Sequence, residues 1–313
     1  MKEIKQFMQY LPKDWKKHKA KENKSASDIL IGISVGDIAG SYFEDKKLNK
    51  AYDYRTIDLL DPSIHGFTDD TVMSFAIFKA ASEIKNRHLF GKKAVNCYAK
   101  YMRELAKEYP DAGYGANFYN WAVNDYENPA YQSYGDGSAM RSGVIGAVFD
   151  NPKVVIKQAV YSALPTHGHP RGIKGAVVVA VMVWMGLHGY TKKEISEYGI
   201  EAYKDSCTNI STNMTLDELV AYGEKHKYET CAIDCDTAVS EAIINFAYTD
   251  SYEMCLRSAL RYMSDADTVM AISGGIAAAY YDKPHFQGVP LDEILPQFLF
   301  GSLEEIFSKI SKL

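Results

Sequence analysis

Apolar residues recur with a helical period along most of the chain. Spacings of three and four residues between apolar positions are those of one face of an α-helix, and capping and breaking residues mark where each run ends. The pattern predicts helices over residues 28–42, 70–85, 91–108, 116–125, 138–149, 152–163, 172–188, 192–203, 236–247, 252–263, 267–281 and 302–311. The period-two alternation of a strand is largely absent. The chain is therefore predicted to be an all-α protein.

The longest apolar run is "AVVVAVMVWMGL" at residues 176–187. It is too short to span a bilayer, which favours a core helix. Several predicted helices also carry closely spaced glycines, each of which costs up to about 1 kcal/mol against alanine inside a helix. We expect these glycines where two backbones, or a backbone and a ligand, approach closely. They are Gly36 and Gly40, Gly143 and Gly146, Gly172 and Gly175, and Gly274 and Gly275.

Residues 1–27 differ from the rest in being rich in lysine, and they lack the apolar stretch of a signal peptide. They indicate an amphipathic helix and linker, with an arm that docks on a membrane or a partner as the alternative. After residue 28 no linker, repeat or low-complexity tract interrupts the pattern. Residues 28–313 are therefore expected to form one compact domain.

Composition and charge exclude several classes of protein. The chain has 313 residues, of which 47% are hydrophobic and 24% charged, as in ordinary globular domains. The net charge of -5 argues against a general nucleic-acid binder. Five cysteines without a C-x-x-C pair indicate reduced thiols and a cytoplasmic location. Cys231 and Cys235 lack the second ligand pair that a zinc site needs.

Two short acidic motifs stand directly before apolar helical runs. They are "TDDT" at residues 68–71 and "DADT" at residues 265–268. Carboxylates and hydroxyls without histidine or cysteine form a hard oxygen ligand set, which suits Mg²⁺, Mn²⁺ or Ca²⁺. The alternative is a pair of ordinary N-caps with acids in the first turn. The pairing of the two motifs favours a metal, because adjacent acids repel one another unless a cation or exposure relieves them.

Three other segments contribute weaker signals. The glycines of "YGDGSAMR" at residues 134–141 open a helix and offer free N–H groups to an anion, although many plain turns look alike. In "THGH" at residues 166–169, a histidine is more often structural than functional. Asp37 and Glu44 are seven residues apart, so they share a face if their helix continues to residue 44.

Taken together, the motifs resemble the ADP-ribosylglycohydrolase family, which includes the dinitrogenase reductase-activating glycohydrolase and its eukaryotic relatives. The matching pieces are "GDIAGSYFE", "TDDT", "GDGSAMR", "THGHPRGIKGA", "AVSEAI" and "DADT" followed by "SGGIAAAYY", spread over residues 28–285. The resemblance implies an all-α orthogonal helical bundle with two Mg²⁺ ions, or alternatively Mn²⁺, at the bottom of an ADP-ribose cleft.

The resemblance also implies roles for individual residues. The metal ligands would be Thr68, Asp69, Asp70, Asp265, Asp267 and Thr268. The substrate-binding residues would be Gly135, Asp136, Gly137, Ser138, Ala139, Met140, Arg141, Thr166 and His167. Glu44 is the first candidate for general acid–base catalysis, followed by Asp69 and Asp265, and Asp37 is an acid that supports the site.

The sequence departs from the family pattern at three places. Met263 and Ser264 stand where two glycines usually precede the second acidic motif. Asp136 replaces a frequent asparagine and adds a negative charge near the diphosphate, which Arg171 is placed to offset. These changes bear on the choice of substrate more than on the metal site.

The resemblance implies hydrolysis of the bond between the anomeric carbon of ADP-ribose and an acceptor, with an ADP-ribosylated protein as the expected partner. A membrane is not expected, and among nucleic acids only an ADP-ribosylated one stays open. The alternatives are a catalytically silent ADP-ribose binder or structural protein, and a two-metal phosphohydrolase. The acceptor would be selected at the rim of the cleft, for which residues 114–134 and 204–236 are candidates.

Overall fold

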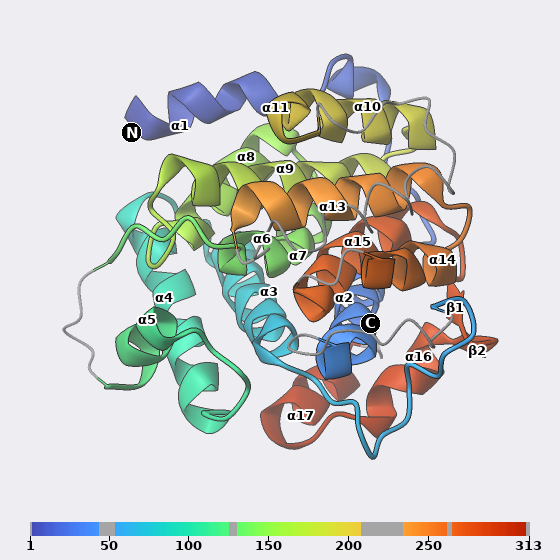
Figure 1. The fold of residues 1–313 in the computed structure, drawn as a ribbon. Helices are drawn as coiled ribbons and strands as arrows, with labels where there is room; N and C mark the ends of the chain where they lie inside the picture. The colour runs from blue at the N-terminus through green and yellow to red at the C-terminus, as the bar shows by residue number, and fades with distance from the viewer. Residues whose placement is uncertain (1, 44–53, 125–129, 208–233, 262–264, 311–313) are drawn as a thin grey trace.

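A computed structural model describes residues 2–43, 54–124, 130–207, 234–261 and 265–310 of the chain. Within these residues the protein is built almost entirely of helices packed around one core (Figure 1). The all-α prediction is therefore confirmed. Strands occur only as the short antiparallel hairpin of β1 (His285–Phe286) and β2 (Val289–Pro290) within the part of the chain described.

The α-helices are α1 Lys2–Phe7, α2 Ala26–Gly40, α3 Asp69–Arg87, α4 Lys92–Glu108, α5 Ala116–Tyr119, α6 Gly137–Met140, α7 Gly143–Val148, α8 Pro152–Ala163, α9 Pro170–Leu187, α10 Lys192–Ala202, α11 Lys204–Cys207, α13 Cys235–Tyr248, α14 Tyr252–Arg257, α15 Ala266–Tyr280, α16 Leu291–Ile294 and α17 Gly301–Ile310. The 3₁₀ turns are η1 Met8–Tyr10, η2 Trp15–Lys17, η3 Ser41–Phe43, η5 Ser258–Arg261 and η6 Leu295–Gln297, and η4 Asn120–Asn124 is a π-helical turn.

The helix predicted over residues 138–149 is in fact two helices, α6 and α7. The break lies at residues 141–142, where the Ser142 hydroxyl and amide both donate to the carbonyl of Ala139. This three-residue spacing tightens the backbone and ends the α-helical ladder. The break leaves Arg141 at the C-cap of α6, close to the site described below.

α2 and α15 form the centre of the bundle and are in unusually close contact. A Cβ added at Gly32 would lie 2.3 Å from Ala278 Cβ, and one at Gly36 would lie 2.3 Å from the carbonyl oxygen of Met270. A Cβ at Gly40 would meet Asp267 Cα at 2.4 Å. The glycines recur every fourth residue, so they form a flat stripe on α2 along which the backbone of α15 lies. Close approach, as predicted for Gly36 and Gly40, is confirmed.

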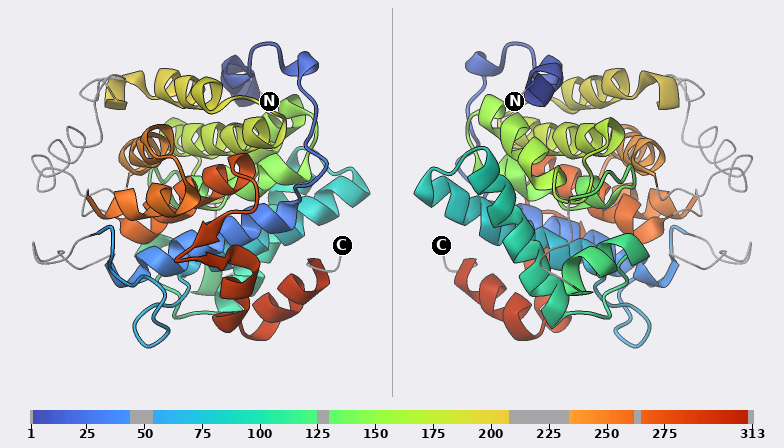
Figure 2. Two further views of the ribbon diagram at one scale, coloured as in Figure 1. Left: turned by 90° about the vertical axis from the view of Figure 1, so that its right-hand side faces the viewer. Right: turned by 90° about the vertical axis from the view of Figure 1, so that its left-hand side faces the viewer.

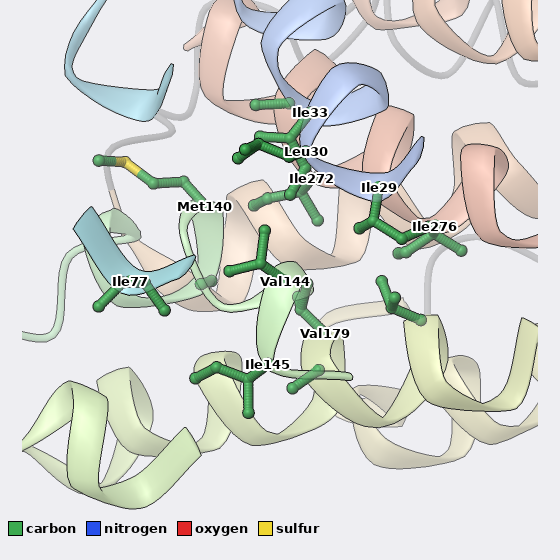
Figure 3. Close-up of a cluster of buried hydrophobic side chains, with 14 of the residues drawn as sticks. Ile29, Leu30, Ile33, Ile77, Met140, Val144, Ile145, Val179, Ile272 and Ile276 are labelled. Carbon is green, nitrogen blue, oxygen red and sulfur yellow. The ribbon is translucent and has the colours of Figure 1, made fainter. Parts of the chain in front are cut away.

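Apolar side chains of the central pair meet those of neighbouring helices in a buried cluster (Figure 3). Ile33 of α2 and Ile272 of α15 face Val144 of α7 and Val179 of α9, and all four are buried. α9 contains the longest apolar run and is long and apolar enough to cross a membrane, yet 83% of it is buried inside this structure. The prediction of a core helix there is confirmed.

The lysine-rich N-terminal segment lies against the bundle. α1 and α10 form an outer layer over α8 and α9 (Figure 2), and Phe7 at the end of α1 is buried. Lys24 Nζ donates to the carbonyl oxygens of Ala278 and Tyr281, at 2.9 and 2.6 Å, and so satisfies the C-terminal end of α15. This segment therefore helps to hold the central helix in place.

Candidate metal centre and substrate cleft

Three buried carboxylates meet where α2, α3 and α15 come together. They belong to Asp37 near the end of α2, Asp70 in the first turn of α3 and Asp267 in the first turn of α15. One carboxylate oxygen of each lies within 4.8 Å of the others, and their residues are 0%, 1% and 2% exposed. The close contact between α2 and α15 brings these acids together, although they are far apart in the sequence.

Asp37 organises the start of α3. Its carboxylate accepts hydrogen bonds from the amide and the hydroxyl of Thr68, at 2.9 and 2.7 Å, and from the amide and the hydroxyl of Thr71. Burial raises the pKa of Asp37, while these hydrogen bonds act in the opposite direction. Four donors leave little capacity for a further ligand, so Asp37 fits the supporting role expected for it.

Asp70 is the least compensated acid of the cluster. Its Oδ2 accepts from Thr268 Oγ1 at 3.1 Å, but its buried Oδ1 has no hydrogen-bond partner among the described residues. Burial, together with the charges of Asp267 and Asp37, holds the pKa of Asp70 well above its ordinary value. A hard divalent cation would relieve both the repulsion and the unpaired oxygen. The donor set therefore fits Mg²⁺ or Mn²⁺.

A cleft of 390 Å³ opens directly above the three acids. Five of the six predicted metal ligands line it, namely Asp69, Asp70, Asp265, Asp267 and Thr268. The sixth, Thr68, caps α3 with its hydroxyl and bonds to Asp37. The structure thus brings the two acidic motifs together, as the pairing argument requires.

Glu44 lies outside the described residues, as do Met263 and Ser264. The condition under which Asp37 and Glu44 would share a helix face, that the helix continues to residue 44, is not met. α2 ends at Gly40 and continues only as the 3₁₀ turn η3, in which the Ser41 hydroxyl donates to the carbonyl of Ile38.

The glycine loop forms the wall of the cleft opposite α3. Gly135, Asp136, Gly137, Met140 and Arg141 line the cleft, whereas Ser138 and Ala139 are buried behind it. The Ser138 hydroxyl donates to the carbonyl of Gly172 at 2.8 Å, which attaches the loop to α9. Two of the seven loop residues expected to bind substrate are therefore placed where they support the loop.

Arg141 is a fully buried cation at the bottom of this wall. Its Nη2 donates to Thr166 Oγ1 at 2.8 Å, while Nε and Nη1 have no partner among the described residues. Burial lowers the pKa of Arg141 to about 10, so the guanidinium still carries its charge at neutral pH. A buried cation with two unused N–H donors requires an anionic or oxygen-rich ligand.

His167 lines the cleft beside Arg141, and Thr166 lies behind it. The hydroxyl of Thr166 lies 2.8 Å from Nδ1 of His167 and so connects the ring to the guanidinium. Burial and the charge of Arg141 hold the pKa of His167 well below its ordinary value. The ring is therefore neutral and is suited to hydrogen bonding rather than to charge pairing.

Asp136 lies between the acidic and basic ends of the cleft. It is hydrogen-bonded to Asp265, and its Oδ2 is buried without a partner among the described residues. Burial raises its pKa well above the ordinary value, and two carboxyl groups share a hydrogen bond only when one of them is protonated. Burial therefore favours the protonated form of Asp136, which is similar in shape to asparagine, while the hydrogen bond with Asp265 acts in the opposite direction.

Arg171 does not offset Asp136, which corrects an expectation. Its guanidinium bonds to Asp234 Oδ1 at 2.6 Å and to Asp236, both at the start of α13, and lies 5.1 Å from the ring centroid of Tyr134. Asp234 also pairs through its backbone with Gly135, the first residue of the glycine loop. Arg171 therefore attaches α13 to the segment that leads into the loop, a role that the sequence did not reveal.

Part of the predicted acceptor rim also lines the cleft. From residues 114–134 these are Gly115, Ala116, Asn117, Phe118, Tyr131 and Ser133. Met73 and Gly113 line it as well and were not predicted. Most of the second predicted rim segment, residues 208–233, lies outside the described residues.

Cys97, Cys235 and Cys255 are not candidate nucleophiles. Cys97, Cys235 and Cys255 are buried free thiols, and burial raises the pKa of each, to about 11 for Cys97. A thiol with a raised pKa supplies very little thiolate at neutral pH. Covalent catalysis by these cysteines is therefore not supported.

Comparison with known proteins gives a consistent result. The model of the ADP-ribosylglycohydrolase family matches residues 19–293. The human ADP-ribosylhydrolase ARH3 is 26% identical, with 90% of this chain and 93% of that protein covered. The mouse ADP-ribosylhydrolase ARH3 is 25% identical, with 80% and 82% covered.

A solved structure described as an ADP-ribosylglycohydrolase-related protein complex matches with a TM-score of 0.59. Its sequence is 19% identical, and the match covers 90% of this chain and 94% of that one. At this identity the match shows a shared fold.

Proposed function

Because the chain belongs to the ADP-ribosylglycohydrolase family, we propose that it is a hydrolase that depends on a divalent cation and releases ADP-ribose from an acceptor. The observation that carries this proposal is the composition of the cleft. One end has a cluster of buried acids with an unpaired oxygen, and the other end has a buried arginine with unpaired N–H groups. A diphosphate with a ribose at its end complements both ends when a cation is present.

The residues that would hold two Mg²⁺ ions, or alternatively Mn²⁺, are Thr68, Asp69, Asp70, Asp265, Asp267 and Thr268. When bound, the ions would supply positive charge that orients ribose hydroxyls and lowers the pKa of water. Asp37 keeps Thr68 in position through its hydroxyl and amide, and so keeps the first acidic motif in register with the second.

The remaining residues divide between catalysis and binding. Asp69 and Asp265 are partly exposed and line the cleft, so either carboxylate can accept a proton from water near the anomeric carbon. Glu44 remains a candidate for the same role. Arg141 and His167 would donate hydrogen bonds to the diphosphate from the opposite wall.

The proposed substrate is an ADP-ribosylated protein. The relatives named ADP-ribosylhydrolase support an ADP-ribose-bearing substrate in general. Gly113 and residues 115–118 line the cleft, and this segment overlaps the rim expected to select the acceptor.

Product analysis tests the proposal. Purified protein would be incubated with arginine-, serine- and acetyl-linked ADP-ribose, in Mg²⁺ and then in EDTA, and the products separated. We expect free ADP-ribose from at least one substrate in Mg²⁺ and none in EDTA. AMP as the product would instead indicate attack on the diphosphate, and binding of ADP-ribose without any product would indicate a silent binding protein.

A pair of matched variants makes the test specific. Asp265→Asn should abolish release, because it removes a proposed ligand at the mouth of the cleft. Asp282→Asn changes an exposed aspartate outside the cleft and should be as active as the unmodified protein. Full activity of Asp265→Asn in excess EDTA would overturn the metal role.

A further inference from the structure

A second hollow, of 450 Å³, lies next to the cleft, and the function proposed above does not use it. We call it the side pocket. Its aromatic residues are Phe67, Tyr109, Phe298 and Phe300, and its acids are Glu108 and Asp111. These residues come from the segments before α3, after α4 and before α17, three regions that are distant in the sequence.

The side pocket borders the metal end of the cleft. Phe67 lines the side pocket and is followed by Thr68 and Asp69 of the first acidic motif. Ala112 lines the side pocket, and the next residue, Gly113, lines the cleft. No residue of the glycine loop lines the side pocket. The acceptor, which leaves the ribose on the side away from the diphosphate, would therefore lie toward the side pocket.

Three rings form the wall of the side pocket. The ring centroids of Phe67, Tyr109 and Phe300 lie 5.1 to 5.8 Å apart. Tyr109 donates its hydroxyl hydrogen to the carbonyl of Phe300 at 2.7 Å and accepts from the amide of Leu303 at 3.1 Å. These bonds fix the rings before any ligand arrives. Phe300 is nevertheless 58% exposed, which is unusual for a large apolar side chain.

The charge of the side pocket is negative. Glu108 and Asp111 are exposed at its edge, and none of the described residues that line it is a lysine or an arginine. Glu108 Oε1 accepts from the amide of Ser302 at 3.1 Å, which holds the carboxylate beside the rings. Among the described residues that line the side pocket, the other titratable groups are Tyr109 and His65. Burial lowers the pKa of His65, so it adds no charge at neutral pH.

Aromatic rings next to carboxylates complement a side chain that carries a positive charge at the end of an aliphatic chain. Cations bind over aromatic rings, and the aliphatic parts of lysine and arginine pack on apolar surfaces. We propose that the side pocket receives a lysine or arginine side chain of the ADP-ribosylated protein, close to the modified residue. The inference rests on the function proposed above and adds to it a preference for basic acceptor sequences.

Matched peptides test the proposal. One peptide carries ADP-ribose next to two lysines, and its partner has glutamine in place of both lysines. Each pair is made with ADP-ribose on serine and on arginine, so that the comparison holds whichever linkage is cleaved. We expect kcat/KM, or affinity where no turnover occurs, to be about fivefold higher for the basic peptide, as one or two cation–aromatic contacts would produce.

The variant Glu108→Gln with Asp111→Asn should bring this ratio close to one. Glutamine at position 108 keeps the oxygen that accepts from Ser302, so the fold is preserved. Glu104→Gln, on the exposed surface of α4, is the matched control and should keep the ratio. Phe300→Ala should lower the ratio too, because its ring is exposed and supports little of the core.

The outcomes separate the two proposals. Equal rates for both peptides, or an unchanged ratio in the double variant, overturn the side-pocket proposal while leaving the hydrolase proposal intact. Failure to bind ADP-ribose in any form overturns the hydrolase proposal and the side-pocket proposal with it. Hydrolysis of acetyl-linked ADP-ribose, which has no peptide, should be the same in the double variant and the unmodified protein.

Discussion

The two ends of the cleft carry opposite charges, yet burial acts on both in the same way. At the acidic end burial raises the pKa of Asp70, and at the basic end burial lowers the pKa of Arg141. In each case the charged form has lost its hydration without gaining a full set of protein partners. Asp70 Oδ1 and Arg141 Nη1 both lack a partner among the described residues.

The two ends of the cleft differ in the kind of ligand that would pair with their unpaired polar atoms. The carboxylates require a cation, whereas the guanidinium requires an anion or several acceptor oxygens. The charge of Asp69 favours the charged form of Arg141, but no carboxylate among the described residues bonds to Nε or Nη1 of its guanidinium. A cleft built in this way stores unfavourable electrostatic free energy that a ligand with both kinds of group would release.

The largest effect is expected from Asp70→Asn. Loss of this proposed ligand should reduce hydrolysis by more than the roughly 100-fold that loss of a supporting group costs at metal sites. The measurement is the rate of ADP-ribose release across a range of Mg²⁺ concentrations. Unchanged activity at all concentrations would show that Asp70 has no role in cation binding.

The same variant tests the electrostatic account through stability. The pKa of Asp70 is higher in the folded chain than its ordinary value of 3.8. The protonated carboxyl therefore contributes to the stability of the fold below pH 3.8, and this contribution is lost as pH rises through the raised pKa. In EDTA, Asp70→Asn should therefore become more stable relative to the unmodified protein as pH rises. Mg²⁺ should reverse the difference, and thermal unfolding from pH 4 to 8 measures both effects.

A smaller effect is expected at the basic end. Arg141→Met removes charge-assisted hydrogen bonds, so affinity for ADP-ribose should fall about 10- to 100-fold. The fold should persist, because a buried uncompensated charge is replaced by an apolar side chain of similar length. Calorimetric titration with ADP-ribose measures the loss of affinity. Arg141→Lys should have an intermediate affinity, because lysine keeps the positive charge but lacks the paired N–H donors of the guanidinium. Wild-type affinity of Arg141→Met would exclude the proposed diphosphate contact.

Arg171→Gln should have a modest effect. The Arg171 side chain is 40% exposed, and partly exposed ion pairs contribute little to stability. We therefore expect KM to rise about two- to fivefold, with kcat nearly unchanged. The effect should be on KM because Arg171 positions the segment before the glycine loop and does not touch the cleft. Arg87→Gln, which breaks an exposed pair with Glu83, is the control. A fall in kcat alone would contradict this positioning role.

The smallest effect is expected from Asp136→Asn. At pH values where Asp136 is protonated the variant should match the unmodified protein, because a protonated carboxyl and an amide are both neutral. As pH rises through the raised pKa of Asp136, the unmodified protein should lose affinity for ADP-ribose while the variant keeps it. Affinity measured from pH 6 to 9 checks this, and an inactive variant at pH 7 would show that the carboxylate itself is required.

Much of the fold could be predicted because helical periodicity is a local property. The predicted helices over residues 70–85 and 152–163 correspond to α3 and α8 to within two residues at each end. The break at Arg141 could not be predicted, because it depends on a hydroxyl that competes for a carbonyl and on a partner, Thr166, in another element. The helix predicted over residues 28–42 also corresponds to α2 to within two residues at each end, and the chain after Gly40 continues as a 3₁₀ turn.

The sequence by itself determined the helical architecture and the two acidic motifs with their oxygen ligands. It also placed glycines at every fourth residue of α2. Only the tertiary structure decided that burial raises the pKa of Asp136, that Arg171 binds α13, and that a negatively charged aromatic pocket borders the cleft. The physical reason is that pKa values and pockets depend on burial and on neighbours from other elements, whereas periodicity and ligand type depend on the residues themselves.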